Sequence, residues 1–173
     1  DIIKQHGHSF AFDSRVENID KDQNYMRIQT TSGDFSANLV VNCGGLQCDK
    51  IAHKTGYGLN MRIIPFRGEY YVLSERARHL CKHLIYPVPD PSMPFLGVHF
   101  TRRITGEVEC GPNAVLAFAR EGYRFSQVEW SALRDYATFS GFYHMTLKHW
   151  RTGLEEIWRS LSKQSFLRAL QRL

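Results

Sequence analysis

A histidine and two arginines stand close together in the middle of the chain, within residues 84–123. His99, Arg102 and Arg103 lie among apolar residues that favour β-strands. A histidine can exchange a proton near neutral pH, and an arginine can hold a carboxylate through paired hydrogen bonds. A few polar groups on a stiff frame are the usual make-up of a ligand site. The pattern predicts a binding site, although an ordinary hairpin with solvated arginines fits the same residues.

The sequence around these residues predicts a rigid loop followed by a β-hairpin. After the apolar run 84–86, several prolines prevent a regular strand ladder. These prolines are Pro87, Pro89, Pro91 and Pro94. Residues 96–101 predict a strand, 104–107 a turn and 108–110 the return strand. We expect the sequence Gly-Pro-Asn at 111–113 to end the return strand abruptly.

Strand alternation assigns the polar groups of this hairpin to faces. His99 should lie on the face opposite Val98 and Phe100, which flank it. Arg102 and Arg103 are neighbours, so they should point to opposite sides of a regular strand. Only one of the two arginines should therefore face a ligand.

Several separate segments, in the same order, closely resemble the flavin-dependent L-2-hydroxyglutarate oxidases and dehydrogenases. Those enzymes belong to the larger family typified by D-amino-acid oxidase and glycine oxidase. The matching segments are IPFRGEY at 64–70, IYPVPD at 85–90, PFLGVHFT at 94–101, GPNAVLAF at 111–118 and REGY at 120–123. The similarity covers most of the chain and weakens after Tyr123.

The resemblance implies FAD-dependent oxidation of L-2-hydroxyglutarate to 2-oxoglutarate, with hydride transfer to the flavin. Such a reaction needs a base for the hydroxyl proton and cationic or hydroxyl groups for two carboxylates. His99 is the candidate base, and Arg67 and Arg102 are candidate carboxylate anchors. Tyr86 matches a substrate-contacting tyrosine of glycine-oxidase-like enzymes, and Asn113 could donate to a substrate carboxylate.

Other interpretations of the same residues stay open. His99 could be structural, Tyr86 a core aromatic and Asn113 a cap of its turn. A related flavin oxidase of an amino acid or of glycerol 3-phosphate is the alternative enzyme. A non-catalytic nucleic-acid-binding domain is the alternative of another class, since the pI is about 9.1 and 13% of residues are aromatic. The basic residues are scattered, however, and no nucleic-acid-binding motif is present.

A strand that runs into a glycine pair is the candidate flavin contact. Residues 39–42 predict the strand, and a helix should follow at 49–55. In glycine-oxidase-like flavoproteins a similar motif passes beside the flavin nucleotide. The resemblance therefore implies that Cys43, Gly44 and Gly45 contact FAD.

Two further expectations about FAD come from the same resemblance. Val16 falls where these proteins place a valine whose backbone holds the adenine. The chain contains no GxGxxG turn for the pyrophosphate. We therefore expect an internal fragment of a longer enzyme, with FAD bound by the parent protein and weakly, if at all, by these residues alone.

The remaining pattern predicts an α+β fold. Short strands at Ser9–Val16, Met26–Thr31 and Phe35–Asn42 predict a β-meander, and 62–73 predicts the longest strand. We expect a mixed or antiparallel substrate-domain sheet with flanking helices, together with part of an FAD-binding domain. The expected division is 1–60 for the returning part of the FAD-binding domain, 61–127 for the substrate-domain sheet and 128–173 for its helical part.

The C-terminal region predicts amphipathic helices. Residues 128–139 form the first, with Trp130, Leu133 and Ala137 on one face. Apolar residues then recur at three- and four-residue spacing. They are Leu147, Trp150, Leu154, Ile157, Trp158 and Leu161. A basic helix of this kind can lie on a membrane, but such a stripe more often packs on its own domain, which is what we expect here.

Composition sets the remaining expectations. The net charge of +5 permits anionic partners without choosing among them. Four cysteines without a CxxC pair or zinc-site spacing predict reduced thiols. We expect a cytoplasmic protein, with peripheral contact on the inner face of the cell membrane as an option. Its expected partners are a 2-hydroxy dicarboxylate and an electron acceptor, oxygen or a quinone.

Overall fold

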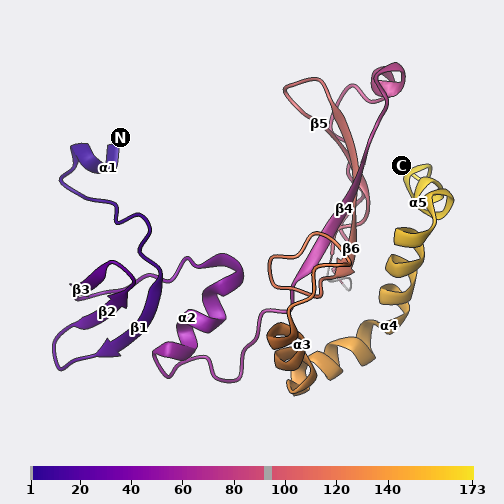
Figure 1. The fold of residues 1–173 in the computed structure, drawn as a ribbon. Helices are drawn as coiled ribbons and strands as arrows, with labels where there is room; N and C mark the ends of the chain where they lie inside the picture. Colours follow the sequence, from indigo (N-terminus) through magenta and orange to yellow (C-terminus); the bar gives the residue numbers. More distant parts are fainter. Residues whose placement is uncertain (1, 92–94) are drawn as a thin grey trace. The chain divides into compact units, whose positions relative to one another are not determined.

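The computed structural model describes residues 2–91 and 95–173, so Pro94 of the segment 94–101 lies outside the described residues. The chain divides into two compact units, Asp1–Ile63 and Ile64–Leu173 (Figure 1). Two small antiparallel sheets and several helices give an α+β architecture. The assignment of 1–60, 61–127 and 128–173 to flavin-binding and substrate parts stays a prediction.

The first unit is a three-stranded antiparallel meander followed by one short helix. Its elements are α1 (Ile2–Gln5), β1 (Val16–Lys21), β2 (Met26–Thr30), β3 (Gly33–Ala37), the 3₁₀ turn η1 (Gly45–Gln47) and α2 (Cys48–Lys54). The strands pair in the order β1-β2-β3, so the predicted meander is confirmed. The predicted helix at 49–55 is also confirmed, with a shift of one residue at each end.

Two predicted strands of this unit have the wrong bounds. The first strand begins at Val16, where the sequence predicted its end, and residues 39–42 are irregular. Leu39 and Val41 are 78% and 74% exposed, so the described residues do not cover them. Apolar and β-branched residues favour a strand, but a strand also needs a neighbour to complete its backbone hydrogen bonds.

The second unit contains the sheet that carries the candidate site. Its strands are β4 (Phe66–Val72), β5 (His99–Arg102) and β6 (Val108–Leu116), in the order β4-β6-β5, and the 3₁₀ helix η2 (Glu75–Leu80) follows β4. The predicted hairpin is confirmed as the antiparallel pair β5–β6. Ile85 adds a single bridge to Phe100, which ties the proline-rich loop to the edge of the sheet.

The predicted end of the return strand is wrong, because β6 continues through residues 111–113. Glu69 pairs with Asn113 and Tyr71 with Cys110, so β6 has one extra residue between these two pairs. This β-bulge accommodates Pro112 inside the strand. Gly111 has a φ of 150°, and a Cβ there would lie 2.7 Å from the Glu69 carbonyl oxygen. Glycine is therefore required beside this bulge.

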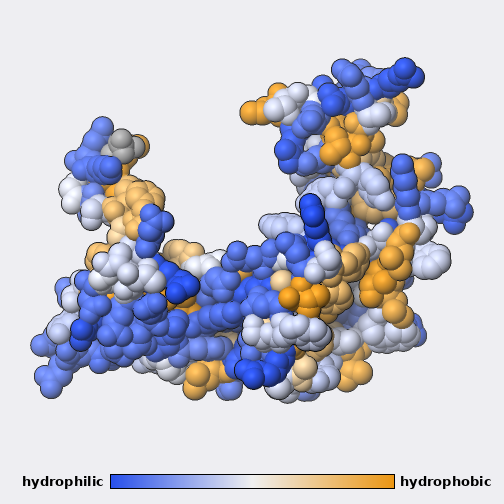
Figure 2. All heavy atoms as spheres, viewed as in Figure 1, coloured by the Kyte–Doolittle hydropathy of each residue, from blue (hydrophilic) through white to orange (hydrophobic). Residues whose placement is uncertain are grey.

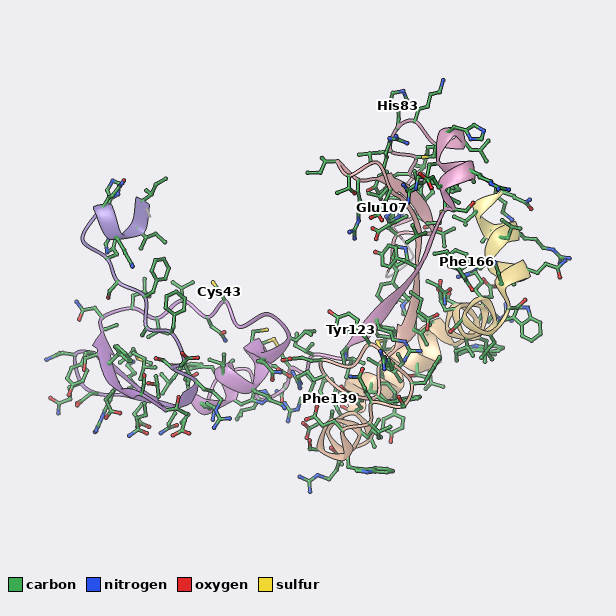
Figure 3. The ribbon with its side chains drawn as sticks, turned by 45° about the horizontal axis from the view of Figure 1, so that its top comes forward. Cys43, His83, Glu107, Tyr123, Phe139 and Phe166 are labelled. Carbon is green, nitrogen blue, oxygen red and sulfur yellow. The ribbon has the colours of Figure 1, made fainter. Side chains whose placement is uncertain are left out.

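The sheet packs on helices from the end of the chain. These are α4 (Ser140–Leu161, bent at His149) and α5 (Lys163–Leu170), while α3 (Trp130–Ala137) precedes them and contacts α4. Cys110, Phe166 and Leu170 form the core cluster. Phe166, labelled in Figure 3, extends from α5 and meets the Tyr71 ring edge-on at 4.8 Å.

The cysteines agree with the sequence-based expectation. All four are free thiols, and Cys81 and Cys110 are buried. Burial, and after it the electrostatic effect of the nearby Cys81 side chain, raises the pKa of the Cys110 thiol to about 11. Cys110 is therefore an uncharged core residue at physiological pH.

The apolar face predicted for α3 is wrong. Ala132 and Tyr136 are buried, whereas Trp130 is 80% exposed. Tyr136 lies against Phe142 at the start of α4, with 6.3 Å between ring centroids. The neighbouring helix therefore selects the buried face, and this neighbour could not be read from the spacing within α3.

The apolar stripe of α4 also differs from expectation. It was expected to pack on its own domain, yet its residues are exposed within the described part of the chain, as Figure 2 shows for the surface along α4. Leu147 is 75% exposed and Trp158 is 64% exposed. Among residues 2–91 and 95–173, no helix combines the length and apolar character needed to span a membrane.

Candidate functional site

Register and contacts divide the candidate residues between the two faces of the second sheet. Val98 and Phe100 pack against the core cluster, so His99 between them lies on the opposite face. This alternation was predicted. We call the face that carries Tyr86, His99 and Thr101 the open face.

Two aromatic rings and a hydroxyl meet on the open face. The Tyr86 ring stacks on the His99 imidazole, with 4.3 Å between centroids and 21° between planes. The Tyr86 hydroxyl lies 3.3 Å from Thr101 Oγ1. Because Tyr86 is 47% exposed, it is not a core aromatic. The bridge between Ile85 and Phe100 holds the segment with Tyr86 beside β5 and thus places Tyr86 and His99 together.

The hydrogen bond of His99 favours one tautomer. His99 Nδ1 lies 3.2 Å from the carbonyl oxygen of Gly97, so Nδ1 carries the proton when this bond forms. In that tautomer Nε2 keeps its lone pair and can accept a proton. His99 thus has the arrangement of a general base, although this role stays a prediction.

Arg67 occupies the opposite, helix-covered face. Its side chain is only 3% exposed, and its Nε and Nη2 donate to Glu69 Oε1 at 3.2 and 2.9 Å. The guanidinium also stacks on Phe125, with Cζ 3.6 Å from the ring centroid. Nη1 is buried and has no hydrogen-bond partner in the described structure. The predicted carboxylate anchor is therefore paired within the protein, with one donor unused.

Asn113 belongs to a polar network between the sheet and α4. It is fully buried, and its amide donates to Glu69 Oε2 at 3.3 Å and to the Glu156 carbonyl at 2.8 Å. Its Oδ1 accepts from Arg159 Nε at 3.2 Å. Glu156 also accepts from Arg159 and from the Ala114 backbone. A substrate contact by Asn113, which stays a prediction, would require one of these bonds to open.

The two adjacent arginines have different partners. Arg102 Nη1 donates to the carbonyl oxygens of Arg78 and Cys81, both at 3.2 Å, and so fastens β5 to the end of η2. Arg103 is 53% exposed and pairs with Glu109 at 2.6 Å. Glu109 is the cross-strand partner of Thr101 and shares the open face. Arg103, rather than the predicted Arg102, thus extends toward the open face.

Sequence reasoning did not identify Tyr70 and Glu69 as part of this region. Glu69 balances the buried Arg67, and the Tyr70 ring lies across Gly68, where a Cβ would meet Tyr70 Cε2 at 3.0 Å. The Tyr70 ring therefore fills the space beside Gly68. The Gly-x-Tyr spacing of Gly68 and Tyr70 on one strand face was a usable signal.

The predicted flavin-contacting segment lies in the first unit. Cys43 is on the exposed loop before α2 (Figure 3). A Cβ on Gly44 would lie 2.5 Å from Ile51 Cδ1, so Gly44 packs on α2. Gly45 has a φ of 52° and open space where a Cβ would be. Val16 begins the edge strand β1.

A family model described as "FAD dependent oxidoreductase" (DAO) matches residues 1–146. This is most of the chain. The chain belongs to the DAO family of FAD-dependent oxidoreductases. Family membership decides against the nucleic-acid-binding alternative and agrees with the flavoprotein expectation.

Curated relatives narrow the resemblance within the DAO family. An L-2-hydroxyglutarate dehydrogenase of Indibacter alkaliphilus is 53% identical over 84% of this chain and 37% of its own length. The enzyme of the same name from Escherichia coli K12 is 40% identical over 99% of this chain and 41% of its own length. The mitochondrial L-2-hydroxyglutarate dehydrogenase of Caenorhabditis briggsae is 42% identical over 91% of this chain and 37% of its own length. The chain thus spans about two fifths of these relatives.

The open loop at Cys43 and Gly45 fits the cofactor of the DAO family. A flat ligand can approach a backbone that carries no Cβ, and Gly45 offers such a surface. Gly44 fits less directly, because α2 already occupies its Cβ position. The contacts of Val16, Cys43, Gly44 and Gly45 with FAD stay predictions.

Proposed function

We propose that the full-length protein oxidises L-2-hydroxyglutarate to 2-oxoglutarate with FAD. The observation that carries this proposal is the 40–53% identity to several enzymes named L-2-hydroxyglutarate dehydrogenase, over 84–99% of this chain. These names favour the hydroxy acid over an amino acid or glycerol 3-phosphate. The first unit would supply part of an FAD-binding domain, and the second unit the substrate sheet.

The open face supplies the groups that would remove the hydroxyl proton in this reaction. Bound FAD would accept the hydride from the hydroxyl-bearing carbon. His99 Nε2 would take the hydroxyl proton, while the bond from Nδ1 to Gly97 fixes the tautomer. Tyr86, stacked on His99, would limit the ring's rotation and line the substrate position. Arg67, Arg102 and Asn113 stay proposed carboxylate contacts.

Anaerobic reduction of the flavin tests the substrate. The purified full-length protein should be yellow, and excess L-2-hydroxyglutarate should bleach it in the absence of oxygen. D-2-hydroxyglutarate, a neutral amino acid and glycerol 3-phosphate are the matched comparisons. Bleaching by one of these, and not by L-2-hydroxyglutarate, would show that the substrate is wrong. Reoxidation by oxygen or by a soluble quinone then distinguishes the two proposed acceptors.

We also propose peripheral contact of α4 and α5 with the inner face of the cell membrane. The apolar side chains along α4 are exposed beside the basic residues Arg168 and Arg172. Apolar burial and attraction to anionic lipid would act together. The full-length protein should sediment with vesicles that contain anionic phospholipid, and several-fold less with neutral vesicles or in high salt. Equal sedimentation with both kinds of vesicle would contradict the proposal.

A further inference from the structure

The open face carries a phenol whose hydroxyl is unused. Tyr70 is 49% exposed, and its hydroxyl forms no hydrogen bond to the residues that the structure describes. The hydroxyl of Tyr86, by comparison, has Thr101 as a neighbour. A free donor on the face of the proposed base can serve a ligand without breaking a protein contact.

The bulge in β6 fixes the position of this phenol beside His99. Gly111 is the cross-strand partner of His99, so a Cβ on Gly111 would point to the open face. That Cβ would lie 2.8 Å from Tyr70 Cδ1, which places the ring over Gly111. The hydroxyl end of the ring lies toward Gly68, 3.7 Å from the position of a Cβ there. Two glycines thus let the ring lie flat on the sheet, next to His99.

The surroundings keep this phenol protonated. Partial burial, followed by the charges of Glu109 and Tyr86, raises the pKa of Tyr70 above its ordinary value. Tyr70 therefore remains a hydrogen-bond donor throughout the physiological range. Arg103 pairs with Glu109 at 2.6 Å and offsets its negative charge, so an anion near Tyr70 is not opposed by an uncompensated carboxylate.

We propose that the Tyr70 hydroxyl donates a hydrogen bond to a carboxylate of the 2-hydroxy acid bound on the open face. This inference rests on the proposed function and adds a specificity-determining residue to it. Tyr70 would hold the carboxylate while His99 faces the hydroxyl group. This contact requires no movement of Arg102 or Asn113, whose side chains bond to other parts of the protein, or of Arg67, which pairs with Glu69 and keeps only Nη1 unused.

The test compares Tyr70→Phe with Tyr71→Phe in the full-length, flavin-loaded protein. Each change removes one hydroxyl, but Tyr71 pairs with Cys110 and meets Phe166 on the helix-covered face. Binding of glutarate, a dicarboxylate that cannot be oxidised, is measured by calorimetry. The KM for L-2-hydroxyglutarate is measured in parallel. Loss of a hydrogen bond to a charged group should weaken glutarate binding by about ten-fold or more in Tyr70→Phe, and should raise the KM by a similar factor. Tyr71→Phe should stay within about two-fold of the wild type.

The two measurements separate this inference from the proposed function. Unchanged glutarate binding in Tyr70→Phe, or equal losses in both variants, would overturn the role of Tyr70. A selective loss of glutarate binding in Tyr70→Phe supports it, even if L-2-hydroxyglutarate fails to reduce the wild-type flavin. In that case the proposed substrate is wrong, and Tyr70 still binds a carboxylate.

Discussion

Replacing His99 with asparagine in the full-length protein should lower the limiting rate of flavin reduction by L-2-hydroxyglutarate about 10²- to 10⁴-fold. Asparagine can still donate toward the Gly97 carbonyl, but it cannot accept the hydroxyl proton. Because a base acts mainly in the transition state, the Kd of the substrate should change far less than the rate. Anaerobic stopped-flow reduction over a range of substrate concentrations gives both values.

His79→Asn is the matched control for this prediction. His79 also uses its Nδ1 on a backbone carbonyl, that of Arg76, but it lies on η2 rather than the open face. The control should reduce its flavin at the wild-type rate. If His99→Asn keeps both the wild-type limiting rate and its pH dependence, His99 is structural and the base lies elsewhere. A loss of stability with normal turnover in the folded protein would lead to the same conclusion.

Arg67→Ala should destabilise the second unit by about 3 kcal/mol, at the lower end of the range for breaking a buried ion pair. The change leaves Glu69 without its cation and opens a space under Phe125. Glu69 is 28% exposed, so water can partly replace the arginine, which is why we expect the lower end. The apparent melting temperature of the full-length protein should fall by several degrees. Arg67→Ala should also impair substrate handling if the unused Nη1 serves a carboxylate.

Arg103→Ala provides the matched comparison for stability. It removes an arginine from an ion pair of similar length, to Glu109, but at a site that is half exposed. Exposed pairs contribute about 1 kcal/mol or less, so this variant should melt close to the wild type. Equal melting temperatures for Arg67→Ala and Arg103→Ala would show that burial of Arg67 does not matter to the fold.

Local pattern was sufficient for some features of the second unit. The alternation around His99 correctly separated it from Val98 and Phe100, because the two-residue period of a strand needs no knowledge of its neighbours. The β5–β6 hairpin was predictable for the same reason, since its turn and both strands are adjacent in sequence. The same alternation did not show that Arg102 would be bonded to the protein itself, because its partners lie at η2, far from it in sequence.

Several other features depend on partners that lie far away in the sequence, and local pattern did not show them. Proline at 112 indicated the end of a strand, but β4 supplies a partner on the other side and a bulge absorbs the extra residue. Residues 39–42 have strand-like composition but lack a strand partner among the described residues. Arg67 and Asn113 were chosen as ligands because their side chains suit carboxylates. The sequence did not show that Glu69 and α4 provide protein partners for both, and their contacts with a substrate stay predictions.

The sequence by itself determined the family resemblance, the meander, the hairpin and the side of β5 on which His99 lies. These features depend on residue types and on periods of a few positions, which the chain carries locally. Only the tertiary structure decided that Tyr70 and Tyr86 lie with His99 on the open face. It also decided that Arg67 and Asn113 lie on the helix-covered face. The physical reason is that a face becomes open or covered through strand register and helix packing, and both depend on residues distant in the chain.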